Sequence, residues 1–203
     1  MGGAPGGGAR GPRIGILGGT FDPVHVGHLS AAVEVRAALG LDRMLLVVAN
    51  LPWQKVGERA VTPAEDRFAV VAAAAAEVEG LEASRMEIDR GGPSYTADTA
   101  AELARLHPGA SLFLVVGSDV AGELATWERE AELRAAVTLV VVRRPGVAVV
   151  PPPPPWRAEA VTIPTLDVSS SDLRARAATG RPLEVLVPPA ALREIRRRGL
   201  YAG

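Results

Sequence analysis

The chain has 203 residues, of which 48% are hydrophobic, and this length suits one α/β domain with a sizeable core. It contains no cysteine, which excludes disulfides and cysteine-bound metals, and its net charge of −1 offers no global field to nucleic acid or to an anionic membrane. The glycine-rich residues 1–12 are predicted to be disordered. They lack the apolar core of a signal peptide and no apolar run reaches transmembrane length, so we expect a cytoplasmic protein.

From Arg13 onward, short apolar runs alternate with helical patterns. The runs predict strands at Arg13–Leu17, Met44–Ala49, Ser84–Ile88, Ser111–Val116, Val137–Val142 and Ala160–Pro164. The helical patterns predict helices at His25–Leu39, Pro63–Glu79, Thr96–Leu106, Ser169–Ala178 and Ala190–Arg198. This alternation is typical of a Rossmann-like, doubly wound parallel sheet. We therefore expect one domain over residues 13–203, with a small C-terminal helical part at about 169–198.

Local signals define several of these boundaries. Gly40 is a plausible C-terminal cap of the first helix, and Thr62 followed by Pro63 and Glu65 is typical of a helix start. The five consecutive residues Pro151–Pro155 favour a polyproline II spacer within a loop at about 144–156. In sheets of this kind, ligands bind beyond the carboxyl ends of the strands, so functional residues should follow strands.

The segment Gly18–His28, GGTFDPVHVGH, lies between the first strand and the first helix. Glycines allow a backbone to approach a phosphate closely, and the helix that follows offers free N–H groups. His25 and His28 are three residues apart, so they lie on one side of the helix start, where each can donate a hydrogen bond to a phosphate. They could instead serve only in capping or packing. A metal pair is disfavoured because His107 is the only other histidine, and no Gly-Lys-Ser/Thr follows to make a Walker-type loop.

The segment resembles the signature of the nucleotidyltransferase superfamily that carries a His-x-Gly-His motif. The segment Val168–Arg174, VSSSDLR, is similar to the second signature of that superfamily, with Ser171 where threonine is usual. The order of the two motifs resembles that of bacterial nicotinate-nucleotide adenylyltransferases. Three further stretches are also similar to that family: Pro52–Lys55, Pro93–Thr99, and Gly117–Trp127. The resemblance extends from Arg13 to about Tyr201, and the proline run is not part of it.

The resemblance implies adenylyl transfer from ATP to nicotinate mononucleotide, which gives nicotinate adenine dinucleotide and pyrophosphate. It implies catalytic roles for His25, His28, Lys55 and Arg174. It implies contacts with ATP or its phosphates for a larger set: Gly18, Gly19, Thr20, Phe21, Gly117, Asp119, Ser169, Ser170 and Ser171. Mg²⁺ should accompany ATP, held chiefly by phosphates and water, so we expect no metal site built by protein side chains alone. Asp119 and the serines could equally act as helix caps.

The same resemblance implies that Tyr95, Thr96 and Trp127 bind nicotinate mononucleotide. An aromatic face can stack on the pyridine ring, and backbone N–H groups can bind its carboxylate; Trp127 could instead only pack in the core. Lys55 is the single lysine among 22 lysines and arginines. Biased coding would explain the scarcity of lysine, whereas a compact, flexible ammonium in a loop would explain why this one is present.

Rival interpretations remain within and outside the enzyme class. A sister enzyme could adenylylate phosphopantetheine or nicotinamide mononucleotide, and a non-catalytic regulator could bind nucleotides on the same fold. The four arginines within Arg193–Arg198 could contact nucleic acid, but basic residues at a helix end also complement its dipole. We expect no nucleic-acid or membrane partner, and the oligomeric state is left open, a homo-oligomer included.

Overall fold

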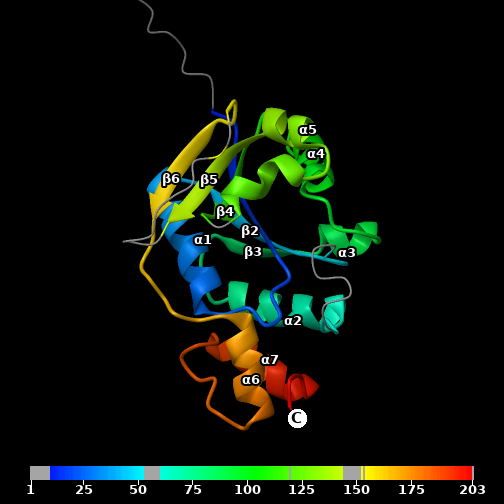
Figure 1. Cartoon of the computed structure of the whole chain (residues 1–203), viewed down its shortest axis with the longest axis vertical. Helices are drawn as coiled ribbons and strands as arrows, with labels where there is room; N and C mark the ends of the chain where they lie inside the picture. The colour runs from blue at the N-terminus through cyan, green and yellow to red at the C-terminus, as the bar shows by residue number, and fades with distance from the viewer. Residues whose placement is uncertain (1–9, 53–59, 119, 144–151, 153, 203) are drawn as a thin grey trace, which may run out of the picture.

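The computed structural model describes residues 10–52, 60–118, 120–143, 152 and 154–202. Six parallel strands form one sheet in the order β3-β2-β1-β4-β5-β6 (Figure 1). The strands are β1 (Arg13–Gly19), β2 (Arg43–Val48), β3 (Leu81–Ser84), β4 (Ser111–Gly117), β5 (Val137–Arg143) and β6 (Ala158–Thr162). The strand order reverses between β1 and β4, which confirms the predicted doubly wound, Rossmann-like fold.

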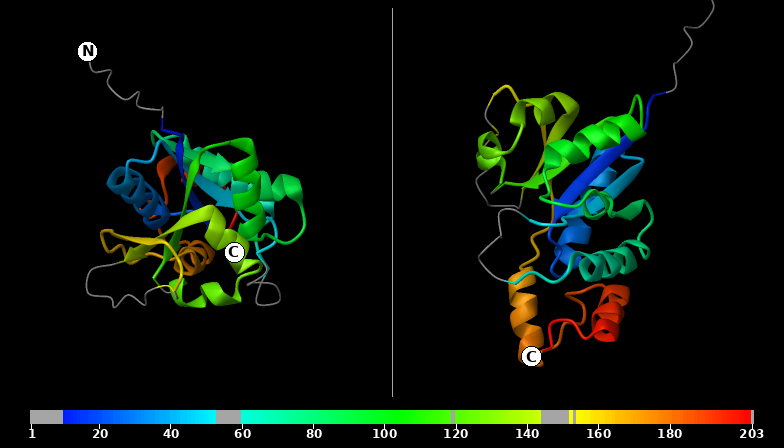
Figure 2. Two further views of the ribbon diagram at one scale, coloured as in Figure 1. Left: turned by 90° about the horizontal axis from the view of Figure 1, so that it is seen from above. Right: turned by 90° about the vertical axis from the view of Figure 1, so that its right-hand side faces the viewer.

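Helices cover both faces of the sheet (Figure 2). They are α1 (Val26–Leu39), α2 (Ala64–Ala75), α3 (Met86–Arg90), α4 (Thr96–Leu106), η2 (Ala121–Thr126, a 3₁₀ helix), α5 (Glu130–Ala136), α6 (Ser170–Ala178) and α7 (Pro189–Arg198). In Figure 1, α6 and α7 lie below α2, beyond one edge of the α/β layers. No helix among the described residues is long and apolar enough to cross a membrane.

The side chains of the central strands point alternately to the two faces of the sheet, so the core has two halves, one on each face. On β2, Met44 and Leu46 pack with α1 and α2, whereas Leu45 and Val47 pack with α4 and α5. Successive side chains of a strand point to opposite faces of the sheet, so a continuously apolar strand such as β2 supplies both halves. Burial on both faces explains why the predicted central strands read as unbroken apolar runs.

Some predicted elements were wrong. The predicted strand Ser84–Ile88 is displaced, because β3 ends at Ser84 and Met86–Arg90 forms α3. Helix α2 begins after Pro63 rather than after Thr62 and ends at Ala75 rather than at Glu79. The sequence implied a short helix after β4 only through the capping role considered for Asp119, and it did not predict α5, although Leu124 and Leu133 are almost completely buried against the sheet. The last strand begins two residues earlier than predicted, at Ala158.

The predicted disordered start and proline spacer are only partly described. Residues 1–9 lie outside the described part of the chain. Pro12, which was predicted to be disordered, accepts a hydrogen bond from the N–H of Ser111 at 2.8 Å and so is part of the fold. Residues 144–151 and 153 also lie outside the described part. Pro154 and Pro155 form a turn rather than the predicted extended spacer.

Candidate active site at the switch point of the sheet

Two cavities lie at the carboxyl ends of β1 and β4, where the strand order reverses. They share one wall, formed by Leu17 on β1 and Val115–Gly117 on β4. The cavity with a volume of about 250 Å³, here called the Trp-side cavity, is also lined by Tyr95, Thr96 and Trp127. The cavity of about 470 Å³, here called the His-side cavity, is also lined by His25 and His28. The histidines predicted to contact ATP and the residues predicted to bind nicotinate mononucleotide therefore lie on opposite sides of one wall.

The loop after β1 begins at the floor of the Trp-side cavity. Gly18, Gly19 and Thr20 line it, and a side chain at Gly18 would meet no atom within 4 Å, so the glycine leaves the backbone open to the cavity. A Cβ at Gly19 would come within 2.9 Å of the Phe21 ring, so a larger residue there would force the ring to shift. Phe21 is buried, with a φ of 50°, and it lines neither cavity. Left-handed backbone is uncommon for a bulky residue, so its surroundings must hold it in place.

The two histidines are stacked at the start of α1. Their ring centroids are 3.7 Å apart, and the edge of the Phe21 ring approaches His28 at 4.9 Å between centroids. His25 is 7% exposed and caps the helix, and its backbone N–H donates to Nδ1 of His28 at 3.2 Å. The prediction that both side chains face one side of the helix start is confirmed. The same two histidines therefore cap the helix and line the His-side cavity.

Side chains distant in sequence hold the carbonyl groups of the loop. Arg67 on α2, only 1% exposed, donates to the carbonyl of Thr20 at 2.8 Å. Arg174 on α6 donates to the carbonyl of Asp22 at 2.6 Å, and the hydroxyl of Ser170 donates to that of Pro23 at 2.9 Å. Three successive parts of the loop are thus fixed from outside it.

The start of α6 contains the remaining predicted serines. Ser169 is the N-cap, and its side chain accepts from the N–H of Asp172 at 3.1 Å, which matches the capping alternative. The hydroxyl of Ser171 accepts from Arg174 at 3.0 Å. Ser169 to Ser171 line neither cavity, although Val168 immediately before them lines the His-side cavity.

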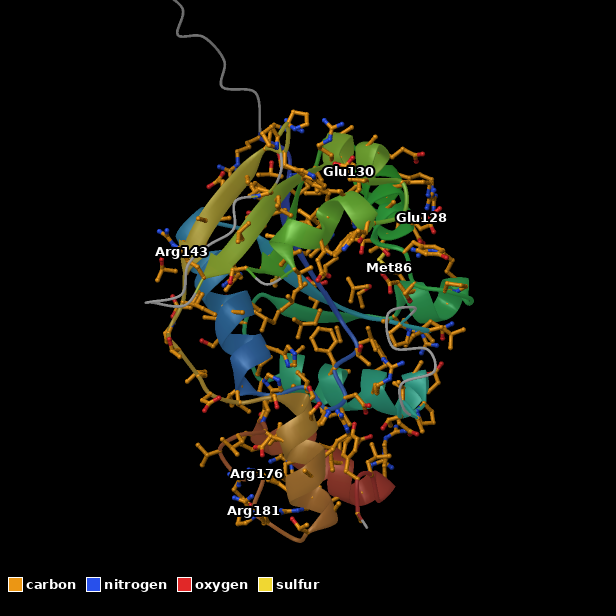
Figure 3. The ribbon with its side chains drawn as sticks, in the orientation of Figure 1. Met86, Glu128, Glu130, Arg143, Arg176 and Arg181 are labelled. Carbon is orange, nitrogen blue, oxygen red and sulfur yellow. The ribbon has the colours of Figure 1, made fainter. Side chains whose placement is uncertain are left out.

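The Trp-side cavity combines an aromatic side chain, a helix start and two acids. Tyr95 is the N-cap of α4 and Thr96 its first residue, so the N–H groups at the start of this helix lie at the cavity. Nε1 of Trp127 is buried and has no hydrogen-bond partner within the described part of the chain. Glu87 and Glu128 also line the cavity. In Figure 3, Glu128 lies near α4 and α5, across the molecule from Arg143 on β5.

Sequence reasoning missed several residues of this site. Glu87 is buried and accepts from the hydroxyl of Thr99 at 2.6 Å. The segment after β6 supplies Ile163, Pro164 and Leu166 to the His-side cavity. Arg67 had a detectable signal, because it lies three and four residues before Val70 and Val71 on the apolar face of α2, where a charge is unexpected.

Two predicted site residues, Lys55 and Asp119, lie outside the described residues. Gly117 lies in the wall between the cavities, and Ser118 after it lines the His-side cavity. In the part of the chain that the structure describes, no three metal-binding side chains gather in one place.

A phosphate-approaching loop, a helix start with two histidines, and paired cavities at the switch point are typical of a nucleotide-binding α/β enzyme. The sequence profile described as cytidylyltransferase-like matches residues 16–176, so the protein is a nucleotidyltransferase of that class. A protein named "Probable nicotinate-nucleotide adenylyltransferase" from Corynebacterium kroppenstedtii is 43% identical over 94% of this chain and 91% of the relative. One of the same name from Saccharopolyspora erythraea is 42% identical over 96% and 92%. The chain belongs to the nicotinate-nucleotide adenylyltransferase family.

Solved structures show the same fold. Nicotinic acid mononucleotide adenylyltransferase of Plasmodium falciparum, complexed with NaAD, matches with a TM-score of 0.73 over 94% of this chain and 97% of that one. The two sequences are only 17% identical, so this comparison shows that the two proteins share a fold and nothing more.

Proposed function

We propose that the protein transfers the AMP group of ATP to the phosphate of nicotinate mononucleotide. The observation that carries the proposal is the pair of cavities with a common wall at the carboxyl ends of β1 and β4. An enzyme that joins two nucleotides needs both reacting phosphates at one point and the two bases apart. One shared wall with a cavity on each side meets that requirement. The named relatives support the choice of substrates.

ATP would occupy the His-side cavity. Its walls are largely apolar, from Ala31 through Val142 to Leu166, and suit an adenine ring. His25 and His28 would donate to the phosphates. Ser170, Ser171 and Arg174 would bind the departing β- and γ-phosphates from the start of α6, near the loop that Ser170 and Arg174 already contact. Lys55 would reach the transferring phosphate and Asp119 a ribose hydroxyl, as the family resemblance implies.

Nicotinate mononucleotide would occupy the Trp-side cavity. The first N–H groups of α4 and the positive end of its dipole would bind the carboxylate, and Trp127 would contact the ring. The ring nitrogen of the mononucleotide carries a positive charge. An aromatic side chain and the carboxylates of Glu87 and Glu128 around the same cavity suit a cationic ring.

The reaction requires little proton transfer. A phosphate oxygen of the mononucleotide, anionic at neutral pH, attacks the α-phosphorus of ATP. The bond from that phosphorus to the oxygen bridging the α- and β-phosphates breaks, and pyrophosphate leaves with the negative charge. Catalysis then depends on alignment by the loop after β1 and on charge stabilisation by histidine, lysine and arginine. Mg²⁺ would arrive with ATP as part of the substrate.

The decisive experiment measures pyrophosphate release with Mg-ATP and one acceptor at a time. We expect kcat/KM for nicotinate mononucleotide to exceed that for nicotinamide mononucleotide roughly 10²-fold. The amide of the second compound cannot form the charge-assisted hydrogen bonds that a carboxylate forms, and its N–H₂ group would face backbone N–H donors and leave them unpaired. Equal efficiency with both would contradict a carboxylate-binding cavity. A preference for phosphopantetheine would indicate a sister enzyme, and nucleotide binding without pyrophosphate release would indicate a regulator.

A further inference from the structure

A buried polar cluster lies beneath the loop after β1. Asp22 is 1% exposed, and its Oδ1 accepts a hydrogen bond from the hydroxyl of Tyr201 at 2.9 Å. Tyr201 stands near the end of the chain, 179 residues away in sequence. Thr62 lies beside the same hydroxyl, and Arg67 is close enough to influence its ionisation. Residues from the loop, from α2 and its approach, and from the C-terminal end therefore meet at one point.

The contact between Tyr201 and Asp22 is one that the fold must keep satisfied. A carboxylate removed from water is costly unless hydrogen bonds compensate for the lost solvation. Burial raises the pKa of the Tyr201 hydroxyl well above its usual range, and the charge of Asp22 acts in the same direction. The hydroxyl therefore remains protonated throughout the neutral and mildly alkaline range and remains a donor to Asp22.

Asp22 lies where the loop is most constrained. Phe21, the residue before Asp22, has a left-handed backbone. The carbonyl of Asp22 accepts a hydrogen bond from Arg174, and the carbonyl of Pro23 accepts one from Ser170. Arg67 and Tyr201 hold the loop from the buried side, and neither residue lines either cavity. Loss of the Tyr201 bond would remove a contact of the Asp22 side chain, and Asp22 is the residue whose carbonyl Arg174 contacts.

We propose that Tyr201 is a positioning residue for adenylyl transfer: through Asp22 it fixes the loop that aligns the reacting phosphates, so the C-terminal end of the chain is a working part of the active site. The inference rests on the proposed function. Because Tyr201 acts on the loop and not on either base-binding cavity, its loss should impair turnover much more than substrate binding.

The test is Tyr201→Phe, which removes one hydroxyl and keeps the ring packed on the core. We expect kcat for pyrophosphate release to fall about tenfold, as misalignment of reacting groups does, while KM for ATP and for the mononucleotide each change less than about threefold. Assays are run well below the Tm of each variant, so that only folded protein is compared.

Leu200→Ala is the matched control. Leu200 is the adjacent residue and packs partly buried against the same core, so its truncation removes apolar contacts but keeps the Tyr201 hydroxyl that donates to Asp22. We expect Leu200→Ala to lower Tm at least as much as Tyr201→Phe and to leave kcat unchanged. Wild-type kcat in Tyr201→Phe, or the same kcat loss in both variants, would overturn the positioning role. A wild-type protein that adenylylates no mononucleotide would instead contradict the proposed function, so the two failures are distinguishable.

Discussion

At His28, the hydrogen bond accepted by the side chain determines which ring nitrogen carries the proton. A backbone N–H can only donate, so Nδ1, which accepts from the N–H of His25 at 3.2 Å, must be unprotonated in the neutral ring. Nε2 is then the protonated nitrogen and the donor. The capping bond thus prepares His28 to offer a hydrogen to a phosphate oxygen, which links a structural role to the proposed catalytic one.

The separate roles of the two ring nitrogens, capping by Nδ1 and donation to phosphate by Nε2, can be tested with two substitutions. His28→Ala removes both nitrogens and should lower kcat about 10²-fold or more, together with a loss of about 1 kcal/mol in stability from the missing cap. His28→Asn should restore much of the stability, because its side-chain oxygen can accept from His25, but not the turnover, because the amide does not reach the position of Nε2. Pyrophosphate release and thermal melting measure the two effects. Near-normal turnover in the Asn variant would show that Nε2 is not a phosphate donor.

Residue identity alone predicted the histidines but not their supports. His25 and His28 could be recognised because they follow glycines after a strand. The second signature indicated Ser170 as a phosphate contact but not its bond to Pro23. Tyr201 gave no comparable signal, because a tyrosine has many possible partners. Only the folded chain brings the hydroxyls of these residues to Asp22 and Pro23.

At the scale of elements, α7 explains the run of arginines that could have suggested nucleic-acid contact. Arg193 pairs with Glu77, Arg196 with Glu184, Arg197 with Glu194, and Arg198 with both Glu194 and Asp66. The bond to Asp66 ties α7 to α2. These pairs support a structural use of the arginines, in addition to the favourable placement of basic residues at a helix C-terminus.

Glu194 gives α7 a pH-dependent contribution to stability. Hydrogen bonds from Arg197 and Arg198 lower the pKa of Glu194 from 4.5 to about 2. A carboxyl group with a depressed folded-state pKa stabilises the fold above its unfolded pKa, and this contribution is lost as the pH falls from about 5 toward 2. Glu194→Gln should therefore lower Tm at pH 7 and have little effect near pH 2.

The control for this prediction is Glu159→Gln. Glu159 is exposed on β6 and makes no ion pair within the described ranges of the chain. Melting curves from pH 2 to pH 7 should show a converging difference for Glu194→Gln and no systematic difference for Glu159→Gln. A Tm difference at position 194 that does not depend on pH would contradict the ion-pair explanation.

The elements that the sequence predicted well are those whose burial is uniform. β2, β4 and β5 are covered on both faces and read as unbroken apolar runs. The wrong prediction at Ser84–Ile88 has a physical reason, because Met86 and Ile88 alternate with polar residues as in a strand. There Glu87 turns inward to bond Thr99, and α3 forms instead. Tertiary contact overrides a short alternating pattern.

At the scale of the whole molecule, the two cavities separate the recognition of the two bases. Trp127 lines only the Trp-side cavity, so Trp127→Ala should raise KM for both mononucleotides about tenfold or more and leave KM for ATP nearly unchanged. Trp156 is a suitable control, because it packs against the same half of the core but lines neither cavity. Steady-state titrations of each substrate provide the measurement. A parallel rise in KM for ATP would show that the cavities are not independent.

The topology could be predicted from the order of strands and helices, and the general position of the site followed from it. The division of the site into two cavities could not be predicted from the sequence. It depends on which side of the wall formed by β1 and β4 each loop reaches. Leu166 and Val168 illustrate the difficulty. They belong to a connection without regular structure, and nothing in their sequence places them beside α1.

The contacts between α6 and the loop after β1 also determine when during synthesis the site becomes complete. Asp22 leaves the ribosome early, but its partner Arg174 follows 152 residues later. At translation rates of about 5–20 residues per second, the loop spends roughly 8–30 s without this partner. The nascent chain can pair β1 with β2 during that interval and still lack the side chains that fix Asp22 and Pro23. Enzymatic activity is therefore gained at the end of folding, and its recovery after refolding should report the docking of the C-terminal helices rather than the formation of the sheet.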